Sequence, residues 1–158
     1  MQAFKPFAAA AVALTCLAIG PVRAQNVDLD PSYGTTDLAS GFQPDPLVIQ
    51  VQSGGSIDAQ SINPGCKGFI ASAADMRVNF TAGALPLIIS VASDADTTLV
   101  VNDAQGNWLC DDDSGNGALN PSITIANPVS GQYDVWVGTF QSGPTQKATL
   151  NVSELYSQ

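Results

Sequence analysis

The sequence has 158 residues, 45% of them hydrophobic and 12% charged, which fits one folded domain and excludes an intrinsically disordered chain. Fourteen acidic residues outnumber five basic ones and give a net charge of -9, so binding to nucleic acid or to an anionic membrane surface is not expected. There is no histidine, which excludes a Ser-His-Asp triad, a Cys-His pair and a His-ligated zinc site.

Residues 1–24 have the pattern of a secretory signal peptide. Lys5 precedes an apolar run over residues 7–19, and the small-residue pattern Val22-Arg23-Ala24 follows it. The run is too short for the roughly 20 residues that a membrane-spanning helix needs. We therefore predict cleavage after Ala24 and a periplasmic or secreted protein with no membrane insertion after cleavage, the alternative being a retained anchor.

Residues 25–42 lack a regular hydrophobic pattern and are predicted to form a lead-in segment across the surface of the domain formed by residues 43–158. In that domain, short runs of alternating apolar and polar residues are separated by clusters of glycine, proline or asparagine. This pattern predicts an all-β fold, an antiparallel β-sandwich or jelly roll of about eight strands. The expected strands are centred on residues 49–52, 76–80, 87–91, 97–101, 108–110, 122–125, 133–137 and 150–152.

Two cysteines lie outside the predicted signal peptide. Cys66 and Cys110 form an even pair in a chain that is predicted to be exported, and such a pair favours a disulfide. A thiol pair for redox chemistry or metal binding is the alternative, but the cysteines are far apart and the sequence has no Cys-x-x-Cys motif. We therefore predict one disulfide bond.

Five aspartates are predicted to gather at one end of the sandwich. Asp94 and Asp96 come just before one expected strand, and Asp111, Asp112 and Asp113 come just after the next. A hairpin with its turn near residues 103–106 would bring both groups together, where like charges repel. Calcium takes six to eight oxygen ligands in flexible geometry and suits such a group better than magnesium does. We predict a calcium site formed by these five residues, the alternative being a solvated acidic loop.

This stretch resembles the bacterial pre-peptidase C-terminal domain family. The resemblance lies in Asp94-Ala95-Asp96-Thr97-Thr98-Leu99, Gly106, Asp112-Asp113 and Ser130-Gly131-Gln132-Tyr133. It implies a jelly-roll sandwich, often stabilised by calcium, in a small exported member that stands alone. Domains of this family usually accompany secreted peptidases, so the resemblance implies roles in export or in substrate binding.

The sequence gives little support for an enzyme. Gly-x-Ser-x-Gly is absent, no lysine beyond the signal peptide completes a Ser-x-x-Lys pair, and Asp96-Thr97-Thr98 lacks the glycine of the aspartic protease motif. Paired carboxylates could hydrolyse a glycoside, but a domain of this size leaves little room for a deep cleft. We therefore expect a protein that is not an enzyme.

Binding through aromatic residues is the remaining prediction. Trp136 alternates with Val135 and Val137, so it is expected on the outer face of its strand, where Trp108 could join it as a ligand-binding aromatic. Cover of Trp136 by residues 25–42 is the other interpretation, and it is the one that we favour. We expect an envelope protein or a polysaccharide as the partner. An accessory or export role beside a separately encoded secreted hydrolase is the second hypothesis, and a small hydrolase is the third.

Overall fold

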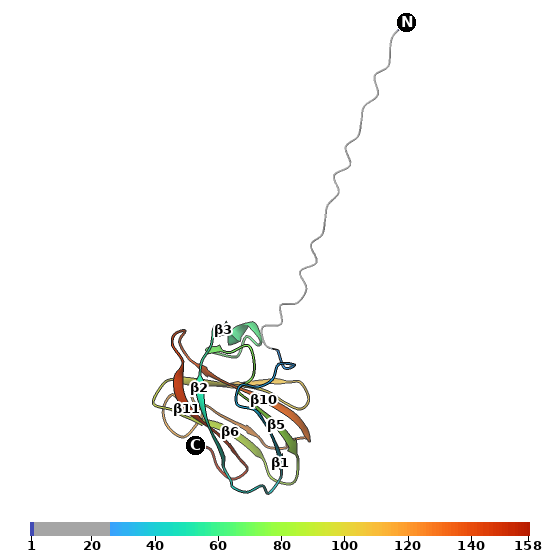
Figure 1. Ribbon diagram of the computed structural model, residues 1–158, viewed down its shortest axis with the longest axis vertical. Coiled ribbons are helices and arrows are strands. Elements are labelled where there is room, and N and C mark those ends of the chain that lie inside the picture. Colours follow the sequence, from blue (N-terminus) through green and yellow to red (C-terminus); the bar gives the residue numbers. More distant parts are fainter. Residues whose placement is uncertain (2–25) are drawn as a thin grey trace.

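The computed structural model describes Met1 and residues 26–158, so the predicted signal peptide lies, apart from Met1, outside the described residues. Two β-sheets pack face to face (Figure 1). The larger sheet has seven strands: β1 (Thr35–Ala39), β3 (Ile57–Asp58), β4 (Phe69–Ile70), β5 (Met76–Thr81), β7 (Thr97–Asn102), β8 (Trp108–Asp111) and β10 (Gly131–Thr139). The smaller sheet has four strands: β2 (Leu47–Ser53), β6 (Leu87–Ala92), β9 (Ser122–Ile125) and β11 (Gln146–Ser153).

The prediction of a β-sandwich is confirmed, and all eight expected strands form. Three further strands, β1, β3 and β4, were not predicted, because each is too short or too polar for a clear alternation. Strand β1 lies within the predicted lead-in segment and pairs in parallel with β5, with Thr35 opposite Arg77. The larger sheet is therefore mixed rather than wholly antiparallel.

The main hydrophobic core lies between the two sheets. Strands β7 and β10 contribute alternate residues to it, such as Leu99 and Val101 from β7 and Val135 and Val137 from β10, all fully buried. The smaller sheet supplies the facing layer from β2, β6 and β11. Alternation in the sequence thus corresponds to the inner face of each strand.

A second, smaller core lies on the outer face of the larger sheet. The segment of residues 56–75, which we call the covering segment, contains β3, β4 and the 3-10 helix η1 (Ala59–Ser61). Its backbone comes close enough to the sheet that a Cβ on Gly68 would lie 2.6 Å from Thr98 Oγ1. The second core contains Ala59, Cys66, Ile70, Ala74, Val100 and Trp136.

No helix among the described residues is long and apolar enough to cross a membrane.

A buried carboxylate bridges a gap in the pairing of β10. Strand β5 pairs with β10 as far as Val135, and β4 resumes the pairing at Thr139. Between them, the backbone N–H of Val137 donates to the Asp75 carboxylate over 2.7 Å. The carbonyl of Val137 accepts from the N–H of Gly54 over 2.8 Å. Asp75 therefore takes the place of a missing strand partner at the centre of the sheet.

We predict that Asp75 makes the protein less stable as pH rises. Burial raises the pKa of Asp75 from 3.8 to about 7, although the hydrogen bond from Val137 lowers it. The folded state therefore binds a proton more tightly than the unfolded state, and stability falls between pH 4 and 7 by up to about 4 kcal/mol. Asp75→Asn should remove this dependence and stabilise the protein above pH 7, as measured by urea denaturation across this range.

The exposed Asp30 offers a matched control for this measurement. Asp30→Asn makes the same substitution at an exposed position and should leave the pH dependence as in the wild type. A stability curve that falls equally steeply in Asp75→Asn and in the wild type would contradict the role given to the buried carboxylate.

Candidate functional site

The predicted hairpin forms and places two of the acidic groups at one end of the sandwich. Strands β7 and β8 pair antiparallel, with Leu99 opposite Asp111, and the chain turns between Asp103 and Asn107. The start of β7, preceded by Asp96, therefore lies beside the loop that follows β8. This loop, residues 112–121, continues into β9 in the other sheet.

Asp111 fixes the shape of this loop. One oxygen of its carboxylate accepts from the backbone N–H of Ser114 and from that of Ser122, each over 2.9 Å. The other oxygen accepts from the Ser114 hydroxyl over 2.6 Å. Since Ser122 begins β9, the Asp111 side chain ties the end of β8 to the start of a strand in the other sheet. These bonds give Asp111 a structural role whether or not a cation binds.

A lysine offers the nearest positive charge to the acidic loop. Lys67 Nζ lies 2.6 Å from a carboxylate oxygen of Asp112 and 5.9 Å from the centre of the Phe140 ring. The hydrogen bond and the charge of Asp112 raise the pKa of Lys67, and the charges of Asp113 and Asp111 add to the rise. Lys67 thus offsets part of the repulsion that the sequence led us to assign to a cation.

The remaining aspartates differ in their surroundings. Partial burial raises the pKa of Asp96, and the charges of Asp113 and Asp112 raise it further. Asp94 and Asp113 are exposed. In the described part of the chain, no group of three or more acidic, cysteine or histidine side chains is close enough to hold a metal ion. The charges of Asp112 and Asp113 therefore act on Asp96. The five carboxylates predicted as calcium ligands, however, do not form one cluster that could hold a metal ion in this structure.

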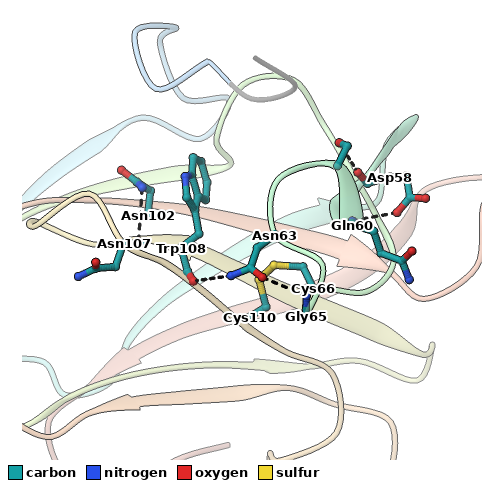
Figure 2. The surroundings of a disulfide bond; sticks show 10 residues. Asp58, Gln60, Asn63, Gly65, Cys66, Asn102, Asn107, Trp108 and Cys110 are labelled. Carbon is teal, nitrogen blue, oxygen red and sulfur yellow. Dashed lines mark hydrogen bonds between the residues drawn. A yellow bond between two sulfur atoms is a disulfide. The ribbon is translucent and has the colours of Figure 1, made fainter. Parts of the chain in front are cut away.

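The sequence held a signal for Lys67 that we did not use. The predicted disulfide forms between Cys66 and Cys110, whose Cα atoms lie 5.2 Å apart, and it ties the covering segment to β8 (Figure 2). Lys67 follows Cys66 directly, and Asp112 comes two residues after Cys110. Any structure that closes this disulfide therefore brings the lysine close to the acidic loop.

The two tryptophans lie on the outer face of the larger sheet, with their ring centres 5.3 Å apart. Trp136 is on the face that alternation predicted, but it is fully buried and its indole N–H has no partner. Residues of the covering segment bury Trp136. Val27 also packs against this second core, but the lead-in segment as a whole does not provide the cover. Trp108 is half-buried, and its carbonyl accepts from the Asn63 side chain over 3.4 Å (Figure 2). Trp136 is therefore not available to a ligand in this structure.

We predict that loss of the disulfide loosens the covering segment. The cysteines are 44 residues apart, so the closed loop stabilises the fold by about 4 kcal/mol on the chain-entropy estimate. The double variant Cys66→Ser, Cys110→Ser should lose stability of that order in denaturant unfolding. Its tryptophan fluorescence should shift to the red, because Trp136 gains contact with water. A double variant with wild-type stability and an unshifted spectrum would contradict this role.

Comparison with known proteins gives a distant structural likeness. No protein-family model matches the chain, and no curated protein matches it. Among solved structures, it is similar to the crystal structure of PliG from Aeromonas hydrophila, a periplasmic lysozyme inhibitor of g-type lysozyme. The two chains are 15% identical, the match covers 79% of this chain and 98% of that chain, and the TM-score is 0.34.

Proposed function

We propose that this protein is an exported β-sandwich module that binds calcium at its acidic end and acts by binding or as a structural component of the cell envelope. The signal-peptide pattern supports export, and so does the disulfide, since such bonds persist in oxidising compartments. A role without catalysis agrees with the absence of histidine from the sequence. Membership of the pre-peptidase C-terminal family remains part of this proposal.

The observation that carries the calcium proposal is the excess of negative charge around Asp96. The neighbouring charges of Asp113 and Asp112 disfavour its ionised form, and the one nearby lysine offsets only part of this charge. A divalent cation bound near these oxygens would relieve the repulsion. Asp96, Asp112 and Asp113 are the candidate ligands. Asp111 would shape the loop through its bonds to Ser114 and Ser122, and the exposed Asp94 is a candidate for the edge of the site.

Thermal unfolding of the purified protein in excess chelator tests this proposal. We expect chelation to lower the melting temperature and calcium, but not magnesium, to restore it. Asp96→Asn combined with Asp113→Asn removes two candidate ligands and should give a melting temperature that is the same with and without calcium. Asp30→Asn, a substitution of an exposed aspartate on the lead-in segment, should keep the full response to calcium.

Lys67 provides a second measurement for the same site. Lys67 is exposed and would compete electrostatically with a bound cation. Lys67→Gln should therefore increase the calcium affinity measured by titration calorimetry. A melting curve that does not respond to chelator or to calcium would contradict the calcium site and favour the alternative, a solvated acidic loop with one ion pair.

A further inference from the structure

The outer face of the smaller sheet is lined by amides and hydroxyls. Gln52 lies opposite Lys147, Gln50 opposite Thr149, and Val48 opposite Asn151 on the paired strands β2 and β11. The alternating residues, such as Val51 and Leu150, point into the main core. Strand β6 continues the outer face with Ala92 beside Thr149 and Ser90 beside Asn151. This face therefore offers mainly polar groups.

The chain itself covers part of this face. Residues 154–158 fold back after β11, and the backbone N–H of Gln158 donates to the Ser90 hydroxyl over 3.0 Å. The backbone N–H groups of Leu155 and Tyr156 donate to the Ser153 hydroxyl. Ser90 and Ser153 are consequently buried although they lie on the outer face. The part of the face nearer to Gln52 and Lys147 stays open.

Two shallow hollows adjoin on the open part of the face. One, of about 380 Å³, is lined by residues that include Ser93, Asp94, Asn120 and Thr149. The other, of about 360 Å³, is lined by residues that include Tyr33 and Gln52. Gln50 and Lys147 line both hollows, so the two lie side by side, and we call them together the polar trough. The trough crosses β2, β11 and β6, about 10 Å from the first strand to the third.

The polar groups of the trough are already held in place. Tyr33 Oη accepts from the backbone N–H of Gln52 over 2.7 Å, which fixes the tyrosine at the free edge of β2. The side chains of Gln50 and Thr149 bond to each other over 3.1 Å. At the other end, the side chain of Asn120 donates to the carbonyl of Ser93 over 3.0 Å. A ligand would therefore meet an ordered surface, which lowers the entropy cost of binding.

The chemistry of the trough indicates the kind of ligand. Its lining contains one carboxylate, Asp94, and one ammonium group, Lys147, so it is close to neutral in a chain of net charge -9. The ion pairs of the described residues use Lys67 and Arg77 but not Lys147. Apart from Tyr33, the apolar residues in the lining are Val51, Ala92 and Ala148. Val51 and Ala148 are buried, so the lining exposes little apolar surface to hold a large apolar side chain of a peptide.

We propose that the polar trough binds a short stretch of a neutral polysaccharide. A sugar ring has an apolar face that can stack on the exposed Tyr33 ring, and its hydroxyls both donate and accept hydrogen bonds. The Gln50 and Gln52 amides and the Thr149 hydroxyl do the same, while Lys147 only donates. An anionic polymer would be repelled by the chain as a whole, and a polycation would prefer the acidic end. This proposal rests on the proposed binding role, but not on the proposed calcium ion.

Titration calorimetry of the full protein with cellohexaose, chitohexaose and maltohexaose tests the proposal, with excess chelator present to exclude the acidic end. At least one of these neutral oligosaccharides should bind, while a galacturonic acid hexamer and oligolysine should not bind at the trough. Tyr33→Ala should weaken binding by about tenfold or more, as expected for a tyrosine anchor. Tyr33→Phe keeps the ring but loses the hydrogen bond from Gln52, so its affinity should lie between those of Tyr33→Ala and the wild type.

Tyr156 provides a matched control, since it is an exposed tyrosine outside the trough whose hydroxyl bonds to the carbonyl of Asp45. Tyr156→Ala should bind as the wild type does, and melting curves should show that both alanine variants are folded. Amide chemical shifts should change at Gln50 and Thr149 on binding. The proposal is overturned if none of the three oligosaccharides binds, if Tyr33→Ala and Tyr156→Ala lose affinity equally, or if the shifts lie elsewhere. A melting temperature that still responds to calcium in that case would leave the proposed function standing.

Discussion

Strand β10 is buried on both faces, and the rest of the architecture follows from this constraint. Its residues from Tyr133 to Thr139 are all buried, alternately against the main core and toward the outside of the larger sheet. A strand with Trp136 on its outer side needs a second layer there, because an exposed indole of that size would forfeit a large apolar contact area. The covering segment provides that layer, and the Asp75 carboxylate provides the hydrogen bond that the interrupted pairing of β10 leaves open.

The covering segment also links the second core to the acidic end of the molecule. The disulfide from Cys66 to Cys110 holds the segment on the sheet, and the next residue, Lys67, reaches Asp112. An exposed ion pair of this kind contributes little stability by itself, so the covalent bond dominates the attachment. What the ion pair changes is the field around Asp96 and Asp113, because it cancels one of several close negative charges. The proposed cation and the lysine therefore act on the same repulsion.

Alternation predicted the strands well because every second side chain of a strand points into the core between the two sheets and is therefore apolar. Strands such as β5 and β10 were predicted within a few residues. Alternation says nothing, however, about what covers the outer face, so the side of the sheet on which Trp136 lies was predicted, but its cover by the covering segment was not. Strand β1 was missed because Leu38 is the one large apolar residue in it. The acidic hairpin was predicted from spacing, whereas Lys67 comes from a distant segment and could be placed only through the disulfide.

The two outer faces of the sandwich differ in how the chain covers them. On the larger sheet the outer residues Val100 and Trp136 are apolar, and the chain covers them with an apolar layer fixed by a disulfide. On the smaller sheet the outer residues are mainly polar, and residues 154–158 cover some of them through single hydrogen bonds to hydroxyls such as that of Ser90. Polar groups pay no penalty for remaining in water, so the fold has no need to cover the others. A hollowed surface with fixed amides, an exposed Tyr33 ring and a lysine outside the ion pairs is more than solubility requires, and this surplus of ordered groups is the physical basis for assigning it a ligand.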